Sequence, residues 1–215
     1  MKKTRIVVVD DHPIVRQGLS QLLAAEADFE VIGQASDAGA AMDLVERLHP
    51  DMVIADLSLK DVSGMELIKQ IRARNDGTKI LVSSMHDEKL YAERCLHAGA
   101  MGYISKEETP EKIVGAIRQI LNGKVYLSPE MSEHFLSRMV KASPDPERPS
   151  ISTLSDRELE VFELIGRGMT TRKIASVLNL SMKTIETYRE NIKIKLGLAN
   201  STELIRRAVQ WQESR

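Results

Sequence analysis

Short apolar runs alternate with amphipathic segments over the first 122 residues, and this alternation restricts the fold more than any other feature. Helical patterns separate the runs, and recognisable start signals stand at Pro13, at the capping-box pair Ser63 and Glu66, and at Thr109-Pro110. Five strands that alternate with five helices predict a doubly wound parallel sheet. The runs with the length and composition of buried strands are 5–10, 30–34, 51–56, 79–84 and 102–105.

The last part of the chain contains helical patterns and no strand-like run. Ser155 and Glu158 form a second capping-box pair, and Ser181 and Ser201 are expected to cap the last two helices. Asn179 tolerates the left-handed conformation that a tight turn needs. We therefore predict an all-α domain with a helix-turn-helix. Its four helices are expected over about 156–165, 171–178, 182–196 and 201–212.

A polar segment with three prolines, residues 141–150, separates the two parts. Such a segment cannot continue a helix and buries little apolar surface, so we interpret it as a linker. A helix near 129–140 precedes it. The predicted organisation is an α/β domain over residues 4–122, a linker over 123–151 that includes this helix, and a helical domain over 152–215.

The two parts of the chain carry opposite net charge. Residues 1–140 hold 17 Lys and Arg against 21 Asp and Glu, a net charge of −4, whereas residues 152–215 hold 11 against 8, a net charge of +3. This asymmetry favours nucleic acid as a partner of the second part. Only one cysteine is present, which excludes a disulfide framework. Because no stretch approaches roughly 18 apolar residues, we expect a cytoplasmic protein without membrane contact.

Polar side chains stand at the ends of four predicted strands. In the flavodoxin-like strand order, the first and third strands flank the point where the order reverses, and ligands bind there. Asp10 and Asp11 would therefore meet Asp56, and such a carboxylate cluster suits Mg²⁺. Ser84 adds a hydroxyl and Lys106 a cation, both suited to phosphoryl oxygens. The set predicts a phosphoryl site in which solvent-accessible Asp56 is the nucleophile.

The first part resembles the receiver domain of two-component response regulators. The matching segments are Val7-Val-Val-Asp-Asp-His-Pro13, Asp56-Leu-Ser-Leu-Lys-Asp-Val-Ser-Gly64, Val82-Ser-Ser-Met-His86 and Gly99-Ala-Met-Gly-Tyr-Ile-Ser-Lys106. The resemblance implies that Asp56 takes phosphate from a sensor histidine kinase and that Asp11 binds Mg²⁺ directly. Asp10 would act largely through water, and the Ser58 backbone carbonyl would be a further ligand.

The same resemblance assigns a switch to the fourth and fifth strands. Ser84 would bind the phosphoryl group, and Tyr103 would turn inward when it does. Ser83 stands where the family usually has an apolar residue, which leaves two neighbouring serines as candidates. His86 and Ser58 occupy positions where the family tunes the lifetime of the phosphorylated state.

The long third helix of the second part has one apolar face and one polar face. Ile185, Ile192 and Leu196 recur at helical spacing and are expected in the core. This part resembles the LuxR-type helix-turn-helix of the NarL/FixJ branch, through 154–161, 174–178, 184–192 and 195–198. The resemblance places base-reading positions at Glu186, Thr187 and Glu190. The full set of expected DNA-contacting residues is Lys183, Thr184, Glu186, Thr187, Tyr188, Arg189, Glu190, Lys193 and Lys195.

Together the two resemblances imply a phosphorylation-dependent transcription regulator, not an enzyme, that forms a homodimer on paired promoter half-sites. One candidate dimer surface is the face of the last helix that carries Leu204, Ala208 and Trp211, which could instead pack in its own bundle. Two other classes stay open: a phosphotransferase or phosphatase with an aspartyl intermediate, and an adaptor whose helical part binds protein.

Overall fold

The computed structural model describes residues 2–59, 62–74, 77–140 and 151–213. The chain divides into two compact units, Met1–Ala142 and Ser143–Arg215. The predicted proline-containing linker, residues 141–150, lies outside the described residues. In the part of the chain that is described, no helix combines the length and the apolar character needed to cross a lipid bilayer.

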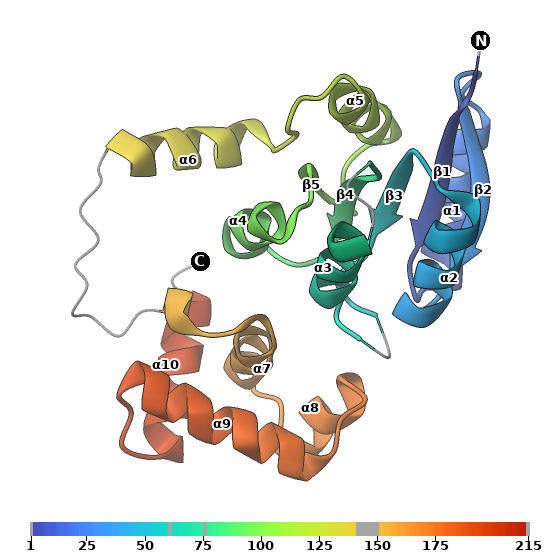
Figure 1. The fold of residues 1–215 in the computed structure, drawn as a ribbon. Coiled ribbons are helices and arrows are strands. Elements are labelled where there is room, and N and C mark those ends of the chain that lie inside the picture. Colours follow the sequence, from blue (N-terminus) through green and yellow to red (C-terminus); the bar gives the residue numbers. More distant parts are fainter. Residues whose placement is uncertain (1, 60–61, 75–76, 141–150, 214–215) are drawn as a thin grey trace. The chain divides into compact units, whose positions relative to one another are not determined.

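A five-stranded parallel sheet forms the centre of the first unit, as predicted (Figure 1). Its order is β2-β1-β3-β4-β5, so the chain steps outward from the first strand to the second and then returns to the other side. The carboxyl ends of β1 and β3 therefore flank the point where the strand order reverses. The strands are β1 (Thr4–Val9), β2 (Phe29–Ala35), β3 (Met52–Ala55), β4 (Lys79–Ser84) and β5 (Gly102–Ser105).

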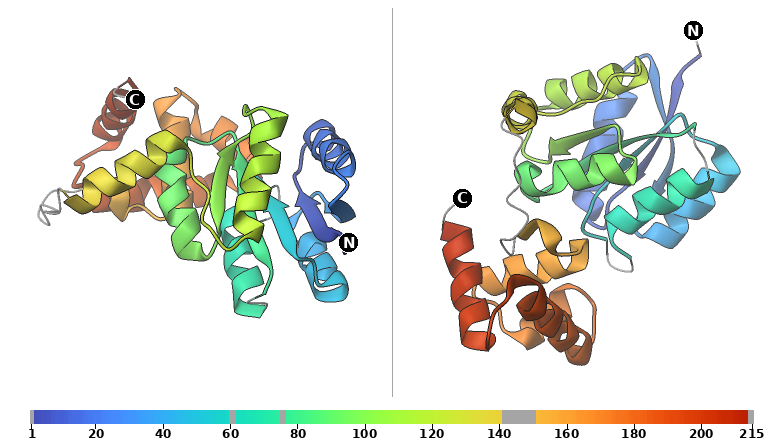
Figure 2. Two further views of the ribbon diagram at one scale, coloured as in Figure 1. Left: turned by 90° about the horizontal axis from the view of Figure 1, so that it is seen from above. Right: turned by 60° about the vertical axis from the view of Figure 1, so that its left-hand side comes forward.

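Helices cover both faces of this sheet (Figure 2). They are α1 (Pro13–Ala24), α2 (Ala38–Leu48), α3 (Gly64–Arg74), α4 (Glu88–Ala98) and α5 (Pro110–Leu121). Leu23 of α1 and Ile117 of α5 share one fully buried cluster with Ile6 and Val8 of β1. Strand side chains at alternating positions face α2, α3 and α4 instead, which explains why the strands read as continuous apolar runs. The sheet therefore forms the centre of the hydrophobic core, with its two faces covered by helices.

The chain beyond α5 continues along the first unit. Tyr126 forms an isolated bridge with Gly102 at the outer strand β5, and its carbonyl accepts a hydrogen bond from the Tyr103 amide. The predicted helix near 129–140 is confirmed as α6 (Pro129–Val140). Just before this helix, the Ser128 amide donates to Oε1 of Glu88 on α4 at 2.9 Å. The first contact attaches the segment before α6 to the edge of the sheet, and the second attaches it to α4.

The second unit is helical, as predicted. A short 3-10 turn (Ile151–Thr153) precedes α7 (Asp156–Gly166), α8 (Thr171–Val177), α9 (Met182–Leu196) and α10 (Ser201–Glu213). The capping box is confirmed, because the Ser155 hydroxyl accepts from the Glu158 amide and the Glu158 carboxylate accepts from the Ser155 amide. Asn179 has a φ of 52°, the left-handed turn conformation that its side chain tolerates. Ser181 caps α9.

The structure corrects one expectation about the last helix and decides between two alternatives for its apolar face. Asn200, not Ser201, accepts the capping hydrogen bond from the Glu203 amide, at 3.0 Å. Leu204 and Ala208 are fully buried, and the ring of Trp211 lies 5.4 Å from that of Phe162 on α7. The face that was a candidate for dimerisation therefore packs inside its own bundle.

Candidate functional site

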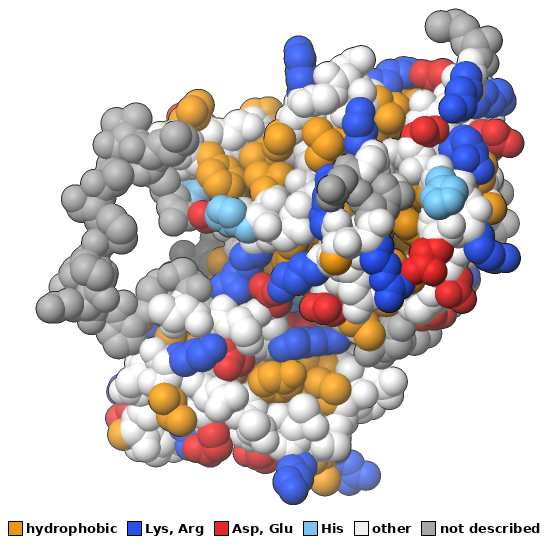
Figure 3. Space-filling model, in the orientation of Figure 1, with side chains coloured by type: hydrophobic (Ala, Val, Ile, Leu, Met, Phe, Trp, Pro, Cys, Tyr) orange, Lys and Arg blue, Asp and Glu red, His pale blue; other side chains and the backbone are white. Residues whose placement is uncertain are grey.

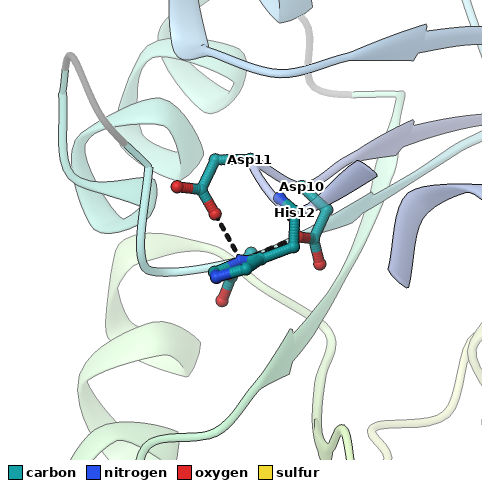
Figure 4. Close-up of side chains that lie close together, drawn as sticks. Asp10, Asp11 and His12 are labelled. Atoms are coloured by element: carbon teal, nitrogen blue, oxygen red, sulfur yellow. Dashed lines mark hydrogen bonds and ion pairs between the residues drawn. The ribbon is translucent and has the colours of Figure 1, made fainter. Parts of the chain in front are cut away.

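Three carboxylates gather at the carboxyl ends of the two central strands. Asp10 follows β1 directly, Asp11 comes next, and Asp56 follows β3. One potential metal-ligating atom from each of these residues and from His12 lies within 4.8 Å of the others. Figure 4 shows that Asp11 and His12 point toward each other beside Asp10, and His12 Nδ1 lies 2.6 Å from Asp11 Oδ1. The strand order thus brings together the carboxylates expected to meet.

Lys106, which follows β5, reaches into this cluster. Its Nζ lies 2.6 Å from Oδ2 of Asp10 and 2.7 Å from Oδ2 of Asp56. Burial acts to lower the pKa of Lys106, but the charges and hydrogen bonds of the two carboxylates outweigh it and raise the pKa above the ordinary 10.5. Lys106 is therefore a buried, charged lysine and not a solvated surface one.

Asp56 is more enclosed than expected. It is only 2% exposed, so the expectation that its carboxylate faces solvent is wrong for this structure. The two carboxylate oxygens of Asp56 differ in their surroundings. Oδ2 accepts a hydrogen bond from Lys106, whereas Oδ1 is buried and receives no hydrogen bond from any described residue. Part of this enclosure comes from Lys106, whose own side chain is almost fully buried and lies against the Asp56 carboxylate.

The loop after β3 and the loop after β4 are joined by a hydrogen bond between Ser58 Oγ and His86 Nε2, 3.0 Å apart. His86 connects further, since its amide donates to Ser84 Oγ at 3.3 Å and its carbonyl accepts from the Tyr103 hydroxyl at 2.7 Å. Ser84 and Tyr103 are both fully buried. Tyr103 therefore occupies the inward position in this structure.

The Tyr103 phenol is held in its neutral form. Burial raises its pKa well above the ordinary 10.0, although its contact with Ser84 acts in the opposite direction. A neutral phenol can donate to the His86 carbonyl, whereas a phenolate cannot. The hydrogen bond and the protonation state thus support each other.

In the second unit, α9 buries one side and exposes the other. Ile185, Ile192 and Leu196 are buried, as expected. On the opposite side the side chains of Lys183, Glu186, Thr187 and Glu190 are exposed, with Thr184 and Tyr188 partly exposed. Figure 3 shows acidic and basic side chains interspersed on the visible face of this unit. The polar side of α9 is thus available to a partner while its apolar side forms the core.

Three of the cations expected to contact DNA are engaged within the unit. Arg189 is only 9% exposed, and its Nε lies 3.6 Å from Oε2 of Glu186. Lys195 Nζ lies 2.6 Å from Glu158 on α7, and Lys193 Nζ lies 2.9 Å from Glu190. These ion pairs partly neutralise the helix that carries them. Lys183 remains exposed near the start of α9.

Two family models match the chain in tandem. The model for the response regulator receiver domain matches residues 6–118, more than half of the chain. The model for bacterial regulatory proteins of the luxR family matches residues 152–208. The chain belongs to the LuxR-family response regulators. It therefore joins a receiver domain to a LuxR-type DNA-binding domain, the architecture of two-component transcriptional regulators.

Relatives of the response regulator share this architecture over nearly their whole length. The oxygen regulatory protein NreC of Staphylococcus carnosus is 35% identical, covering 96% of this chain and 97% of that protein. The transcriptional regulatory protein UhpA of Escherichia coli is 33% identical, with 94% and 96% covered. The solved structure of Salmonella RcsB bound to the rprA promoter with phosphomimetic BeF₃⁻ is 26% identical, with a TM-score of 0.63 and 95% and 98% covered.

The residues of the receiver domain fit a divalent cation. Receiver domains typically bind Mg²⁺ at an acidic pocket, and here oxygen ligands from three carboxylates converge. Oδ1 of Asp56 is buried without a hydrogen-bond donor among the described residues, whereas Oδ1 of Asp11 lies 2.6 Å from His12 Nδ1. Buried carboxylate oxygens without donors are costly, and a hard cation that takes oxygen ligands would satisfy them.

Sequence reasoning gave no role to two residues that shape the receiver site. The Arg16 side chain donates to the Asp10 carbonyl, which anchors the turn after β1 on α1. A Cβ atom added to Gly64 would lie 2.0 Å from the Asp56 carbonyl oxygen, so only glycine allows α3 to begin against the backbone of Asp56. The glycine eight residues after Asp56 was the signal available for this contact.

Proposed function

We propose that this response regulator is a phosphorylation-dependent transcription factor in which Asp56 accepts the phosphoryl group. The observation that carries the proposal is the unequal environment of the two Asp56 oxygens. Lys106 holds Oδ2 at 2.7 Å, which leaves Oδ1 as the oxygen available for attack. Carboxylate nucleophiles of this kind form aspartyl phosphates.

The phosphoryl donor in this proposal is a phosphohistidine of a sensor histidine kinase. Oδ1 of Asp56 forms the new O–P bond as the P–N bond of the donor breaks, and the histidine nitrogen keeps the electron pair and takes up a proton. Asp10, Asp11, Asp56 and the Ser58 carbonyl would hold Mg²⁺, which supplies positive charge to the transferring group. Access requires neighbouring side chains to move, and His12, whose side chain is 65% exposed, can rotate outward.

The phosphoryl group changes the contacts of Lys106 and Ser84. A new dianionic group on Asp56 competes for the ammonium that now bridges Asp10 and Asp56. The Ser84 hydroxyl, which accepts from the His86 amide, would donate to a phosphoryl oxygen from the end of β4. Because His86 also holds Tyr103, a movement of this loop is transmitted to β5. A local change in charge thus biases a larger two-state element.

The readout in this proposal is DNA binding by a homodimer through α9. The residues that present exposed polar surface are Lys183, Glu186, Thr187 and Glu190, whereas Arg189 is buried and Lys195 pairs with Glu158 of α7. Helix-turn-helix domains place such a helix in the major groove, and dimers match paired half-sites. The promoter-bound structure of RcsB supports DNA as the partner class.

A role as phosphatase or phosphotransferase is less well supported. An enzyme that turns over a phosphate ester needs a second acid or base beside the nucleophile. Among the described residues near Asp56, the close groups are the paired Lys106, Asp10, Asp11 and His12. A domain of the luxR family of regulatory proteins would also have no role in such an enzyme. The same match favours DNA over protein as the partner of the helical domain, and so disfavours the adaptor.

The test compares the full-length chain with its Asp56→Asn variant. Acetyl phosphate and Mg²⁺ should add one phosphoryl group to the wild-type chain, measured by intact mass, and should increase both its dimer fraction and its affinity for a selected promoter. Asp56→Asn should gain no stable phosphoryl group and show neither increase. Equal behaviour of both chains would refute the phosphorylation step. Affinity that does not decrease steeply with salt would refute DNA binding through phosphate contacts.

A further inference from the structure

The carboxylate of Glu186 is held between the two helices of the helix-turn-helix. Its Oε1 accepts a hydrogen bond of 2.9 Å from the Thr171 hydroxyl, and Thr171 is the first residue of α8. Its Oε2 lies 3.6 Å from Nε of Arg189, one turn further along α9. Glu186 is nevertheless 55% exposed at its side chain, so the fixed carboxylate faces outward. Two helices and a buried cation therefore set the direction of an exposed acid.

An exposed carboxylate on a DNA-recognition helix calls for a physical reason. Phosphate groups repel it, and α9 would bind any duplex more tightly without it. A carboxylate is favourable in the major groove when it accepts a hydrogen bond from an exocyclic base amine, and the amine that acids usually pair with is N4 of cytosine. Arg189 reduces the cost, since its guanidinium lies beside the carboxylate and offsets the repulsion.

Orientation distinguishes Glu186 from the other acid on this side of the helix. Among the residues that the structure describes, the carboxylate of Glu190 pairs with Lys193 of its own helix at 2.9 Å, and its side chain is 62% exposed. Glu186 instead is restrained by a hydroxyl from α8 in addition to a cation on α9. A restrained side chain loses less conformational freedom when it binds a base, which strengthens the contact.

We propose that Glu186 specifies a cytosine in each half-site and that Thr171 is the positioning residue that aims it. This inference rests on the proposed function, because it deepens how the same domain selects its DNA. One carboxylate oxygen stays on the Thr171 hydroxyl, and the remaining lone pairs accept from cytosine N4. The contact reads the base, whereas Thr171 touches only the protein.

The test is a selection of randomised duplexes by the full-length chain treated with acetyl phosphate and Mg²⁺, followed by sequencing. The wild-type chain should enrich cytosine at one position per half-site by roughly tenfold. Glu186→Gln should change the preferred base at that position to adenine, because a glutamine amide pairs with adenine N6 and N7. Retention of cytosine by this variant, or no base preference at any position in the wild-type chain, would overturn the inference.

Thr171 is tested with a pair of variants. Thr171→Val keeps the shape of the side chain but removes the hydroxyl, and it should reduce the cytosine preference several-fold, whereas Thr171→Ser should retain it. Equal preferences in both would refute the positioning role. Trp211 fluorescence, which reports folding of this unit, should be the same in all variants. Glu213→Gln, the same change of charge at the end of α10, is the control and should leave the preferred base unchanged.

The outcomes separate this inference from the proposed function. If the wild-type chain enriches no duplex, DNA binding itself fails, and the inference fails with it. If it enriches a motif that Glu186→Gln does not change, the proposed function stands and only the assignment of Glu186 is refuted.

Discussion

The ammonium group of Lys106 donates a hydrogen bond of 2.7 Å to Oδ2 of Asp56, and both side chains are almost fully buried. Asp10 shares the same ammonium at 2.6 Å. One cation thus compensates two carboxylates that could not both be buried as charged groups without it. The same cation lies beside the oxygen that we propose for phosphorylation, so stability and signalling depend on one contact.

Replacement of Lys106 by methionine should lower the free energy of unfolding by about 3 kcal/mol in EDTA, because two buried carboxylates lose their cation. Mg²⁺ should restore part of this loss. The raised pKa of Lys106 means that its contribution is fully present below pH 10.5 and disappears as the pH rises through the folded-state value, so the variants should converge there. Urea unfolding, followed by circular dichroism, measures the free energy of unfolding of both chains at each pH. Lys112→Met, at an exposed lysine whose ion pair with Glu108 is solvated, should leave stability nearly unchanged.

Asp11→Asn should have opposite effects with and without metal. In EDTA the variant should be more stable than the wild-type chain by about 1 kcal/mol, because one like charge leaves the cluster. The stabilisation by Mg²⁺ should largely disappear, since a ligand oxygen has lost its charge. Thermal unfolding at several Mg²⁺ concentrations measures both effects. Asp43→Asn, at an exposed position of α2, should respond to Mg²⁺ as the wild-type chain does; an equal response of Asp11→Asn would contradict the site.

Gly64→Ala should damage the receiver site through the backbone. The added methyl group would lie 2.0 Å from the Asp56 carbonyl oxygen, so α3 or the Asp56 loop must move, at a cost of about 1–3 kcal/mol. Phosphorylation by acetyl phosphate, followed by intact mass, should slow as well. Gly115→Ala is the matched control, because nothing lies within 4 Å of its added Cβ and it occupies the middle of α5; it should increase stability by about 0.5–1 kcal/mol. Equal effects of the two substitutions would contradict this reasoning.

Much of the fold follows from local signals in the sequence. The five apolar runs became the five strands because burial on both faces requires continuous apolar residues. The Ser155 capping box and the Asn179 turn formed because their side chains satisfy backbone groups within a few residues. The cap of the last helix was misassigned because Asn200 and Ser201 are adjacent and both are good N-caps. Local chemistry alone does not choose between neighbours.

The sequence predicts where the candidate sites lie, but it does not predict the burial and the ion pairs of their individual side chains. The carboxylates converge because parallel strands end at one edge, which the strand pattern already implies. The burial of Asp56 involves contacts with distant segments, such as the one with Lys106, and sequence patterns do not report such contacts. Arg189 was different: it lies four residues after Ile185 and three before Ile192, so helical spacing already placed it on the buried face. The charge of Arg189 favoured a contact with DNA, whereas its position on the helix favoured burial in the domain core, and the side chain is buried.

Glu158 joins the first and third helices of the DNA-binding unit, and its removal should destabilise that unit. Its carboxylate accepts from the Ser155 amide at 2.7 Å and lies 2.6 Å from Nζ of Lys195 at the end of α9. Burial acts to raise the pKa of Glu158, but the Lys195 and Ser155 contacts lower it below the ordinary 4.5. Glu158→Ala loses the cap and the ion pair, whereas Glu158→Gln keeps an acceptor for the cap and loses only the charge.

We therefore expect Glu158→Ala to cost about 2 kcal/mol at pH 7 and Glu158→Gln less than about 1 kcal/mol, since Lys195 is partly solvated. A lowered pKa means that the ion pair contributes fully above pH 4.5 and is lost as the pH decreases through the folded-state value, so Glu158→Gln and the wild-type chain should converge in acid. The single tryptophan, Trp211, contacts Phe162, so its fluorescence follows this unit alone during urea unfolding. A difference between the two chains that persists unchanged below pH 4 would show that Lys195 does not stabilise the Glu158 carboxylate.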